Sequence, residues 1–565
     1  MILTSGADQV RAARDFLHTH RTDYKAAYAG FQWPRPETFN FALDWIDEIA
    51  RTRDKEALRI CSDSGPVVSR TFSDLSRASN RIANFLIKSG AKRGDAILLM
   101  LNNVVGLWEF MLGAMKIGAI VIPATPLLSP SDVLDRIKRG RVRFVVAASE
   151  FHDRFATSPE WRGFYVGAPV AGWQALSDAQ HCADTFTPDA PTKGSDPLLL
   201  YFTSGTTSLP KLVQHCHLSY PVGSLSTMYW IGLQRDDVHV NISSPGWAKH
   251  AWSCIFAPWL AEACVVALNH ARFNAAATLE ALVREGVTTF CAPPTVWRLI
   301  IQEDLAKTRP KLREAVAAGE PLNPEVIARI EEAWGLTIRD GYGQTETSAL
   351  IANTPGQKIV PGAMGRPLPG FAIHLRDDDG NDVQEGQISV RLNNHHGRVV
   401  GVMDGYRVEG ALQPLAGEFY QTGDVAMVDA DGMLTYVGRA DDVFKASDYR
   451  ISPFELESVL IEHPAVVEAA VVPSPDPLKL AVPKAFVALS PKHAATAETA
   501  ASILAHARKV LGPFKRIRRI EFFDLPKTVS GKIRRAELRK MEAERRAKGE
   551  KAAAEWHEDD LTSAE

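Results

Sequence analysis

Hydrophobic and polar residues alternate along the first part of the chain at the spacings of helices and strands. Residues 71–90 open with hydroxyl and acidic side chains, place apolar residues near a helical repeat and end on glycine, as amphipathic helices do. The continuous apolar run 96–101 follows, which is typical of a strand buried on both faces. Residues 105–118 and 119–122 repeat this pair, and 279–292 show it again. The alternation predicts α/β layers around a largely parallel sheet.

The pattern changes at about residue 359, where proline and glycine become frequent and the apolar runs become short. Four alternating runs, at 372–375, 387–391, 425–428 and 434–437, are separated by turn signals. Residues 359–438 are therefore predicted to form a small antiparallel β-module.

A third pattern follows. The sequence SPFE at 452–455 is a capping box with proline at the first helical position, and strand, helix and strand signals come after it. We place a domain boundary near 439–442. The predicted fold is α/β, with a large N-terminal domain of layered α/β sheets over 1–438 and a smaller α+β C-terminal domain over 439–540. The charged segment 541–565 is predicted to be a solvated tail.

Composition narrows the function classes. With 45% hydrophobic and 23% charged residues, the 565-residue chain is typical of a globular protein of several domains. With a net charge of −3, the chain lacks the overall excess of positive charge that is typical of nucleic-acid-binding proteins. The six cysteines lack C-x-x-C spacing, which argues against a zinc site or redox pair, and such scattered thiols fit a cytoplasmic location. We expect no secretory signal and no membrane span, because no basic-then-apolar start and no long uncharged apolar stretch occur.

The sharpest local motif follows a predicted strand at 198–202. A run of small and hydroxyl residues ends at Lys211, and such a run lets backbone N–H groups turn inward around an anion while the lysine adds positive charge. The motif is not a Walker A loop, and a Ser/Thr-rich turn is the alternative for it alone. Its residues are Thr203, Ser204, Gly205, Thr206, Thr207, Ser208, Leu209, Pro210 and Lys211.

A second motif, DGYGQTET, spans residues 340–347 and follows a predicted strand at 336–339. Its glycines permit close backbone approach, and Tyr342 offers a stacking face for a planar base. Glu346 is a hard oxygen ligand suited to Mg²⁺. A loop with a solvated glutamate is the alternative.

Two further motifs carry charged residues suited to a nucleotide. Asp424, in YQTGD, can accept both hydroxyls of a ribose, and Arg439, in GRADD, can donate to a sugar or a phosphate. Lys532 ends the loop PKTVSGK at 526–532, from which a lysine can be delivered to a distant site by domain motion. A surface turn, a surface ion pair and a solvated basic loop are the alternatives for these motifs taken singly.

Together, the four motifs resemble the adenylate-forming superfamily of acyl-CoA synthetases, luciferases and peptide-synthetase adenylation domains. The resemblance covers about 71–538, and within the superfamily the chain is most similar to medium-chain acyl-CoA synthetases. It implies a mobile C-terminal domain and two steps, in which a carboxylate attacks the α-phosphate of ATP and the CoA thiol then attacks the acyl-adenylate. The segments that carry it are YFTSGTTSLPK (201–211), GYGQTET (341–347), GRADD (438–442), YRISPFELE (449–457), EHPAVVEAA (462–470) and LPKTVSGKIR (525–534).

The resemblance also implies a role for each motif. Lys532, Glu346 and Thr206 would be catalytic, with Glu346 helping to hold Mg²⁺ and Lys532 contacting the reacting carboxylate. The loop at 203–211, the phosphate loop, would hold the β- and γ-phosphates. Residues 319–321 and 340–345 would surround the adenine, and Asp424 and Arg439 would bind the ribose. The ATP-binding residues so implied are Thr203, Ser204, Gly205, Thr206, Thr207, Ser208, Lys211, Gly319, Glu320, Pro321, Asp340, Gly341, Tyr342, Gly343, Gln344, Thr345, Asp424, Arg439 and Lys532.

The hinge and the acceptor site are implied in the same way. Asp441 matches the hinge position. Three departures from the family pattern stand out: Ser208 replaces a usual glycine in the phosphate loop, Asp448 replaces a glycine beside the pantetheine path, and Leu480-Ala481 replaces a Gly-Glu pair. The positions at which relatives contact CoA correspond to Ser447, Asp448, Tyr449, Lys479 and Arg508.

The acyl group would lie near Gly343, which stands where acetate-activating relatives carry tryptophan before Gln-Thr-Glu. Losing that indole implies a pocket deeper by several methylenes. Lys249 can pair with a polar group on the acid, although a structural role is the more natural expectation. The residues implied to form the pocket are Trp247, Ala248, Ala318 and Gly343.

We therefore predict an AMP-forming carboxylic acid:CoA ligase that takes ATP, Mg²⁺, CoA and a medium-chain or aromatic monocarboxylic acid. A stand-alone adenylation enzyme that loads a carrier protein in trans is the alternative. A non-catalytic nucleotide-binding protein is disfavoured, because the charged residues of all four motifs are present. No nucleic-acid partner is expected, and the sequence leaves the oligomeric state open.

Overall fold

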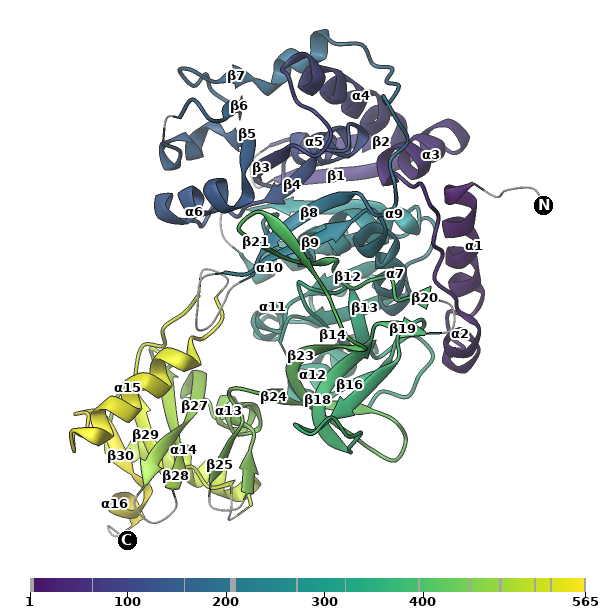
Figure 1. Ribbon diagram of the computed structural model, residues 1–565. Coiled ribbons are helices and arrows are strands. Elements are labelled where there is room, and N and C mark those ends of the chain that lie inside the picture. The colour runs from purple at the N-terminus through teal and green to yellow at the C-terminus, as the bar shows by residue number, and fades with distance from the viewer. Residues whose placement is uncertain are drawn as a thin grey trace.

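The computed structural model describes residues 5–562 apart from 63–64, 157, 204–209, 271–272, 321, 395–396, 447–448, 477–479, 513–514 and 529–530. Two large sheets with helices on their faces form the N-terminal domain, and a smaller sheet with its own helices forms the C-terminal domain beside it (Figure 1). The predicted α/β class with a large N-terminal and a smaller C-terminal domain is confirmed. No described helix is both long enough and apolar enough to cross a membrane.

The first sheet is parallel in one half and antiparallel in the other. From β14 through β13, β12, β10 and β11 to β1 its strands run parallel, whereas the strands from β15 to β17 pair antiparallel. In spatial order the strands are β17 (Ile373–Arg376), β18 (Glu385–Arg391), β23 (Phe419–Val428), β24 (Leu434–Arg439), β16 (Ala363–Pro367), β15 (Ala349–Ala352), β14 (Arg339–Gly343), β13 (Glu314–Ala318), β12 (Thr289–Ala292), β10 (Val238–Asn241), β11 (Cys264–Asn269), β1 (Glu56–Ser62) and β2 (Val68–Thr71).

The second sheet carries the strands on both sides of the phosphate loop. Strand β8 ends just before that loop and β9 begins just after it, and the two pair antiparallel. In spatial order the strands are β22 (Ala411–Pro414), β21 (Gly405–Val408), β9 (Leu212–Cys216), β8 (Pro197–Phe202), β4 (Ile120–Pro123), β3 (Ala96–Met100), β5 (Val142–Ala148), β6 (Arg162–Val166) and β7 (Gln174–Ala175).

The helices follow from local sequence signals. Helix α4 (Phe72–Lys88) starts with a reciprocal capping box between Thr71 and Asp74, and it packs on α5 (Val105–Lys116) at Gly113, where a Cβ would lie 2.6 Å from Ile82 Cγ2. Both predicted helices are confirmed. The other α-helices described in this domain are α1 (Gly6–Thr19), α2 (Tyr24–Gly30), α3 (Asp47–Thr52), α6 (Pro130–Gly140), α7 (Ser224–Ile231), α8 (Ala248–Ala251), α9 (Ala257–Leu260), α10 (Ala275–Arg284), α11 (Pro294–Ile300) and α12 (Pro324–Trp334).

The predicted β-module of residues 359–438 is antiparallel but does not form a sheet of its own. Strand β16 pairs with β15 on one side and with β24 on the other, so most of its strands extend the first sheet. Strands β21 and β22 instead join the second sheet, where Tyr406 lies opposite Val213 of β9. The short pair β19 (Asn393–Asn394) and β20 (Gly397–Arg398) stands apart. The module therefore joins the two sheets, because some of its strands pair with the first sheet and others pair with β9 of the second sheet.

The C-terminal domain is built around one four-stranded sheet. Its helix α13 begins where Ser452 Oγ accepts the N–H of Glu455, which confirms one half of the predicted capping box. The Glu455 carboxylate accepts Lys515 Nζ, and the reciprocal bond to the Ser452 N–H is not among the described contacts. Strand β27 pairs antiparallel with β28, β28 parallel with β29, and β29 antiparallel with β30. The elements are β25 (Phe444–Ala446), β26 (Tyr449–Ile451), α13 (Pro453–Ile461), β27 (Val466–Asp476), β28 (Leu480–Leu489), α14 (Ala497–Val510), β29 (Arg519–Phe522), α15 (Arg535–Ala547), β30 (Glu555–His557) and α16 (Glu558–Thr562).

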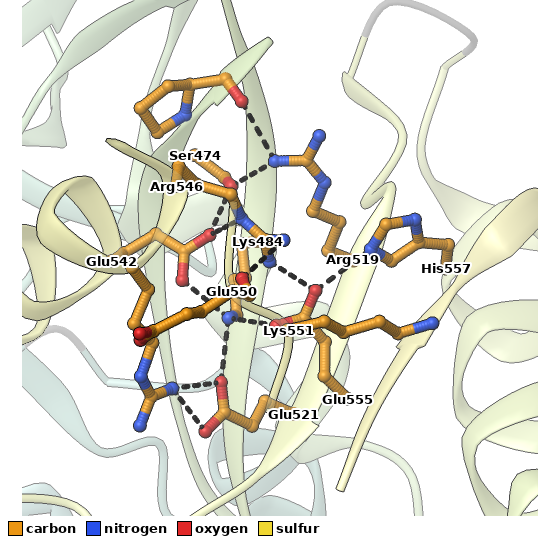
Figure 2. Close-up of polar contacts among 12 residues, drawn as sticks. Ser474, Lys484, Arg519, Glu521, Glu542, Arg546, Glu550, Lys551, Glu555 and His557 are labelled. Carbon is orange, nitrogen blue, oxygen red and sulfur yellow. Dashed lines mark hydrogen bonds and ion pairs between the residues drawn. The ribbon is translucent and has the colours of Figure 1, made fainter. Parts of the chain in front are cut away.

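The prediction of a solvated tail from residue 541 is wrong for the described part of that segment. Lys484 of β28 is buried, and its Nζ lies 2.6 Å from Glu542 Oε2, 2.7 Å from Glu555 Oε2 and 2.7 Å from Glu521 Oε2 (Figure 2). Two of these glutamates belong to the segment, on α15 and β30. Its charged composition suggests solvation, but these charges pair inward and close the segment over the sheet.

This network makes a prediction about acid stability. Burial alone would raise the pKa of Glu555, but hydrogen bonds from Lys484 and Arg546 outweigh it and lower the pKa to about 2, below its ordinary 4.5. Such a group stabilises the fold above its unfolded-state pKa and loses that contribution as the pH falls through the folded-state value. We therefore expect the Tm to drop between about pH 4.5 and 2, and Glu555→Gln to flatten this drop. The exposed Glu550→Gln is the control, and identical profiles for Glu555→Gln and the unaltered protein would contradict the prediction.

Candidate functional site

A cavity of about 630 Å³ lies between the first sheet and the C-terminal domain. Its walls come from the ends of β13 and β14, from β23 and β24, and from the C-terminal loop before α15. Residues from all four sequence motifs therefore meet at one place. Those that line the cavity are Thr203, Lys211, Gly319, Glu320, Asp340, Gly341, Tyr342, Gly343, Gln344, Thr345, Glu346, Asp424, Arg439, Asp441 and Lys532.

Other predicted site residues lie elsewhere or outside the described residues. Trp247, Ala248 and Ala318 are not among the described residues that line the cavity, although Ala318 directly precedes Gly319. Tyr449 belongs to β26, and its side chain lies outside the description. Ser204, Gly205, Thr206, Thr207, Ser208, Pro321, Ser447, Asp448 and Lys479 lie outside the described residues.

The Asp424 carboxylate is held by four donors, which come from β14, from the residue that follows it and from β24. Tyr342 Oη and Gln344 Nε2 donate to Oδ2, at 2.6 and 2.5 Å, while Tyr436 Oη and Arg439 Nη1 donate to Oδ1, at 3.2 and 3.3 Å. Asp424 and Arg439 are directly opposite each other in the β23–β24 pair. Burial, together with the Asp424 charge, raises the pKa of Tyr342 well above its ordinary value, so this tyrosine remains a donor. The carboxylate is thereby fixed in orientation at the cavity wall.

Glu346 is joined to the phosphate-loop lysine through Tyr406. Tyr406 Oη donates to Glu346 Oε1 at 3.1 Å, and Lys211 Nζ lies 5.0 Å from the centroid of the Tyr406 ring. Burial raises the pKa of the Glu346 carboxyl. A carboxylate in such a place gains from a nearby cation, and hard oxygen donors are what Mg²⁺ takes. The residues present therefore fit a magnesium ion held together with a nucleotide.

The second motif occupies a strand rather than a loop after one. Residues 340–343 form most of β14, because β14 pairs with β13 on one side and with β15 on the other. Burial raises the pKa of Asp340 to about 7, even though the N–H groups of Leu322 and Gly341 donate to its carboxyl. A Cβ at Gly341 would lie 2.4 Å from the Trp230 ring. Glycine is therefore required here for packing.

Gly343 lines the cavity through its backbone. A Cβ at this position would lie 2.6 Å from the backbone oxygen of Ser348 and 3.3 Å from Ala349 Cα. A side chain would therefore start against the neighbouring backbone, and the turn between β14 and β15 would have to move to accept it. We expected the acyl pocket to be deeper because residue 343 is glycine and not tryptophan. The geometry around Gly343 does not by itself establish this deeper pocket.

Lys532 sits on a turn that is closed by its own hydrogen bonds. Thr528 N–H donates to Lys532 O at 2.8 Å, Lys532 N–H donates to Thr528 Oγ1 at 3.1 Å, and Gly531 N–H donates to Thr528 O at 2.9 Å. Gly531 has a φ of +83°, a conformation that favours glycine. The lysine side chain is exposed and lines the cavity. A turn of this kind presents the lysine from the C-terminal domain towards residues of the N-terminal domain.

The chain crosses between the domains at residues 439–442. Arg439 is bound to Asp424 on the sheet, and Ala440 N–H donates to Gly423 O at 2.8 Å. Two residues later, Asp442 forms ion pairs with Arg539 and Arg535 of α15, the latter at 3.9 Å. The crossing is therefore anchored to one domain before Asp441 and to the other domain after it.

Two predicted contact residues have partners within the protein. Lys249 Nζ donates to Ala318 O at 3.1 Å, and burial lowers the pKa of Lys249. Arg508 Nε lies 2.7 Å from Glu558 Oε1, in the C-terminal segment that was predicted to be solvated. The Lys249 contact matches its expected structural role.

Sequence reasoning missed several residues that line the cavity. Tyr420 donates to Gln344 Oε1 at 2.8 Å and lies four positions before Asp424 on β23, and Tyr436 lies on the adjacent strand. A period of two along these strands is the signal that would have found Tyr420. Tyr406 gives no such signal, because it comes from the other sheet. The missed lining residues include Thr295, Arg298, Tyr406, Tyr420, Gln421, Tyr436, Glu457 and Arg535.

Comparison with known families gives two matches. The AMP-binding enzyme family matches residues 46–407, and the AMP-binding enzyme C-terminal domain matches residues 455–532. The two matches divide the chain on either side of the crossing at 439–442.

Comparison with individual proteins gives close relatives along most of the chain. The 4-hydroxybutyrate–CoA ligase 1 of Metallosphaera sedula is 40% identical, over 92% of this chain and 93% of that one. The mitochondrial acyl-coenzyme A synthetase ACSM3 of Homo sapiens is 35% identical, over 92% of each chain. Among solved structures, the anthranilate CoA ligase AuaEII in complex with anthranoyl-AMP is 30% identical, with a TM-score of 0.79 over 90% of this chain and 98% of that one.

Proposed function

This chain belongs to the AMP-binding enzyme family and is an acyl-CoA ligase, and we propose that it activates a medium-chain or aromatic monocarboxylic acid as an acyl-adenylate before transferring the acyl group to CoA. The observation that carries the proposal is the convergence of Lys211, Glu346, Asp424, Arg439 and Lys532 on one cavity.

The first step would join two anions. The acid carboxylate and the triphosphate of ATP repel each other, so the site must neutralise charge and hold the reacting atoms in line rather than supply its own nucleophile. Lys211 and the phosphate loop would bind the β- and γ-phosphates, and Lys532 would lie at the reacting carboxylate. Mg²⁺ held at Glu346 would neutralise part of the phosphate charge.

The nucleoside would lie along the first sheet. Asp424 is already oriented by its tyrosine, glutamine and arginine donors, so ribose hydroxyls would replace some of these donors rather than bind a free carboxylate. Gly341 and Gly343 would let the purine approach the β14 backbone, with Tyr342 beside it. These roles are the ones that the family resemblance implies, and the grouping of the residues around one cavity supports them.

The relatives support a range of acids rather than one. Their names specify 4-hydroxybutyrate and anthranilate, and a solved structure 27% identical to this chain is a benzoate CoA ligase. A pyrophosphate-release assay over fatty acids of increasing length, 4-hydroxybutyrate, benzoate and anthranilate tests the proposed class. We expect turnover with medium-chain or aromatic acids, and CoA thioester as the product. Thioester formation on a carrier protein but not on CoA would instead favour the adenylation enzyme that acts in trans.

Gly343 provides a test of the proposed acyl site. Gly343→Trp should shift preference towards shorter acids by roughly tenfold or more for each carbon excluded, because a hydrophobic pocket discriminates by about 1–3 kcal/mol per methylene. Gly343→Ala is the matched control, since its Cβ meets the same Ser348 oxygen without adding an indole. Specificity constants for acids of different lengths measure the shift. If Gly343→Trp has the same length preference as Gly343→Ala, the acyl group lies elsewhere.

A further inference from the structure

A guanidinium group outside the cavity is bonded to the backbone at the base of the phosphate loop. The strands that lead into and out of this loop, β8 and β9, pair antiparallel, and at their ends Thr203 N–H donates to Lys211 O at 2.9 Å. We call these two residues the neck of the loop, and both line the cavity. The carbonyl of Pro210, which directly precedes Lys211, accepts Nη2 of Arg139 on α6 at 2.6 Å.

The same arginine also contacts the strand on the other side of the neck. Arg139 Cζ lies 5.2 Å from the ring centroid of Phe202, the last residue of β8, and Arg136 Cζ lies 5.0 Å from it. Arg139 Nη1 is 3.1 Å from Asp135 Oδ2, one turn earlier on α6. A planar guanidinium can stack on a ring, donate to a carbonyl and pair with a carboxylate at the same time. Arg139 therefore contacts the chain on both sides of the neck.

Arg139 acts from a helix whose start is well fixed. Helix α6 begins with a reciprocal capping box between Ser129 and Asp132. The Arg139 side chain is 29% exposed, and it is not among the described residues that line the cavity. Any influence of Arg139 on a bound nucleotide must therefore pass through Thr203 and Lys211.

We propose that Arg139 is a positioning residue for ATP, which it serves by holding the neck in the arrangement that binds the triphosphate. This inference rests on the proposed function, in which ATP binds in this cavity. Lys211 is exposed, so its direction depends on how firmly the backbone before it is held. The bond to Pro210 O fixes that backbone before the nucleotide arrives, which reduces the entropy lost on binding.

Calorimetric binding of ATP with Mg²⁺ to the full-length enzyme, without acid or CoA, tests the proposal. Arg139→Gln should weaken ATP binding about tenfold, which is typical of losing a hydrogen bond from a charged group. The KM for ATP should rise by a similar factor, whereas the KM for the acid and the Tm should change little. Arg139→Lys keeps the charge but lacks the planar fork, so we expect most of the same loss.

The control is Arg143→Gln, which removes the same charge from an exposed position on β5 and should leave ATP binding unchanged. Unchanged ATP binding in Arg139→Gln would overturn the inference. Full ATP binding in Arg139→Lys would show that only the charge matters, and a lower Tm with equal increases in the KM for ATP and for the acid would show a general structural role; either also overturns it. Failure of the proposed function would appear in the unaltered enzyme as absent acid-dependent pyrophosphate exchange, whereas failure of this inference appears only in the variants.

Discussion

Lys532→Ala is expected to slow acyl-adenylate formation by about 10²–10³-fold, the usual cost of removing one preorganised electrostatic contact. Negative charge builds between the carboxylate and the α-phosphate during this step, and Lys532 lines the cavity from a turn braced by Thr528 and Gly531. Once the adenylate exists, this charge is needed less. Acyl transfer from pre-made adenylate to CoA should therefore stay near the unaltered rate.

Two separate assays measure this contrast: pyrophosphate exchange for the first step, and thioester formation from supplied acyl-adenylate for the second. The control is Lys540→Ala, which removes an exposed lysine from the same domain and should affect neither step. Equal losses in both steps would show that Lys532 does not act specifically in adenylation.

Asp441→Pro is expected to produce the reverse, with adenylate formation preserved and thioester formation slowed by about 10²-fold or more. The residues before Asp441 are bound to the first sheet through Asp424 and Gly423, and Asp442 is bound to α15 through Arg539. A rotation of the C-terminal domain would therefore have to occur at residues 440–441. Proline fixes φ at 441 and restricts the residue before it, so the rotation is blocked.

The matched control is Asp441→Ala. It removes the contact of 3.5 Å between the Asp441 carboxylate and Arg439 Nε but keeps the backbone free, so it should affect thioester formation far less than proline does. Similar losses in the alanine and proline variants would assign the effect to the side chain and contradict a hinge at this position.

Local patterns predicted the elements whose signals are contained in a short stretch of sequence. The capping box of Thr71 and Asp74 fixed the start of α4, and the run at 96–101 gave β3. The phosphate-loop, DGYGQTET and GRADD motifs were recognisable from their own residue types, and the family resemblance that they carry implied that their residues would meet. The same local patterns ended the predicted strand at residue 339, before residues 340–343, because they do not show that β13 and β15 pair on both sides of these residues.

The errors share one physical cause, which is partners distant in sequence. Tyr406 reaches Glu346 because β21 pairs with β9 in the second sheet, and nothing near Tyr406 in the sequence indicates this register. The segment after 541 has the charge of a solvated tail, yet Glu542 and Glu555 are buried against Lys484 on β28. Charge pairing across a sheet cannot be inferred from composition.

The most direct test of the account is acid-dependent exchange of pyrophosphate into ATP in the absence of CoA, followed by identification of the products after CoA is added. The account predicts exchange that requires the acid but not CoA, and then AMP and acyl-CoA in equal amounts. Release of ADP and phosphate, or exchange that begins only when CoA is present, would contradict an acyl-adenylate intermediate at this site.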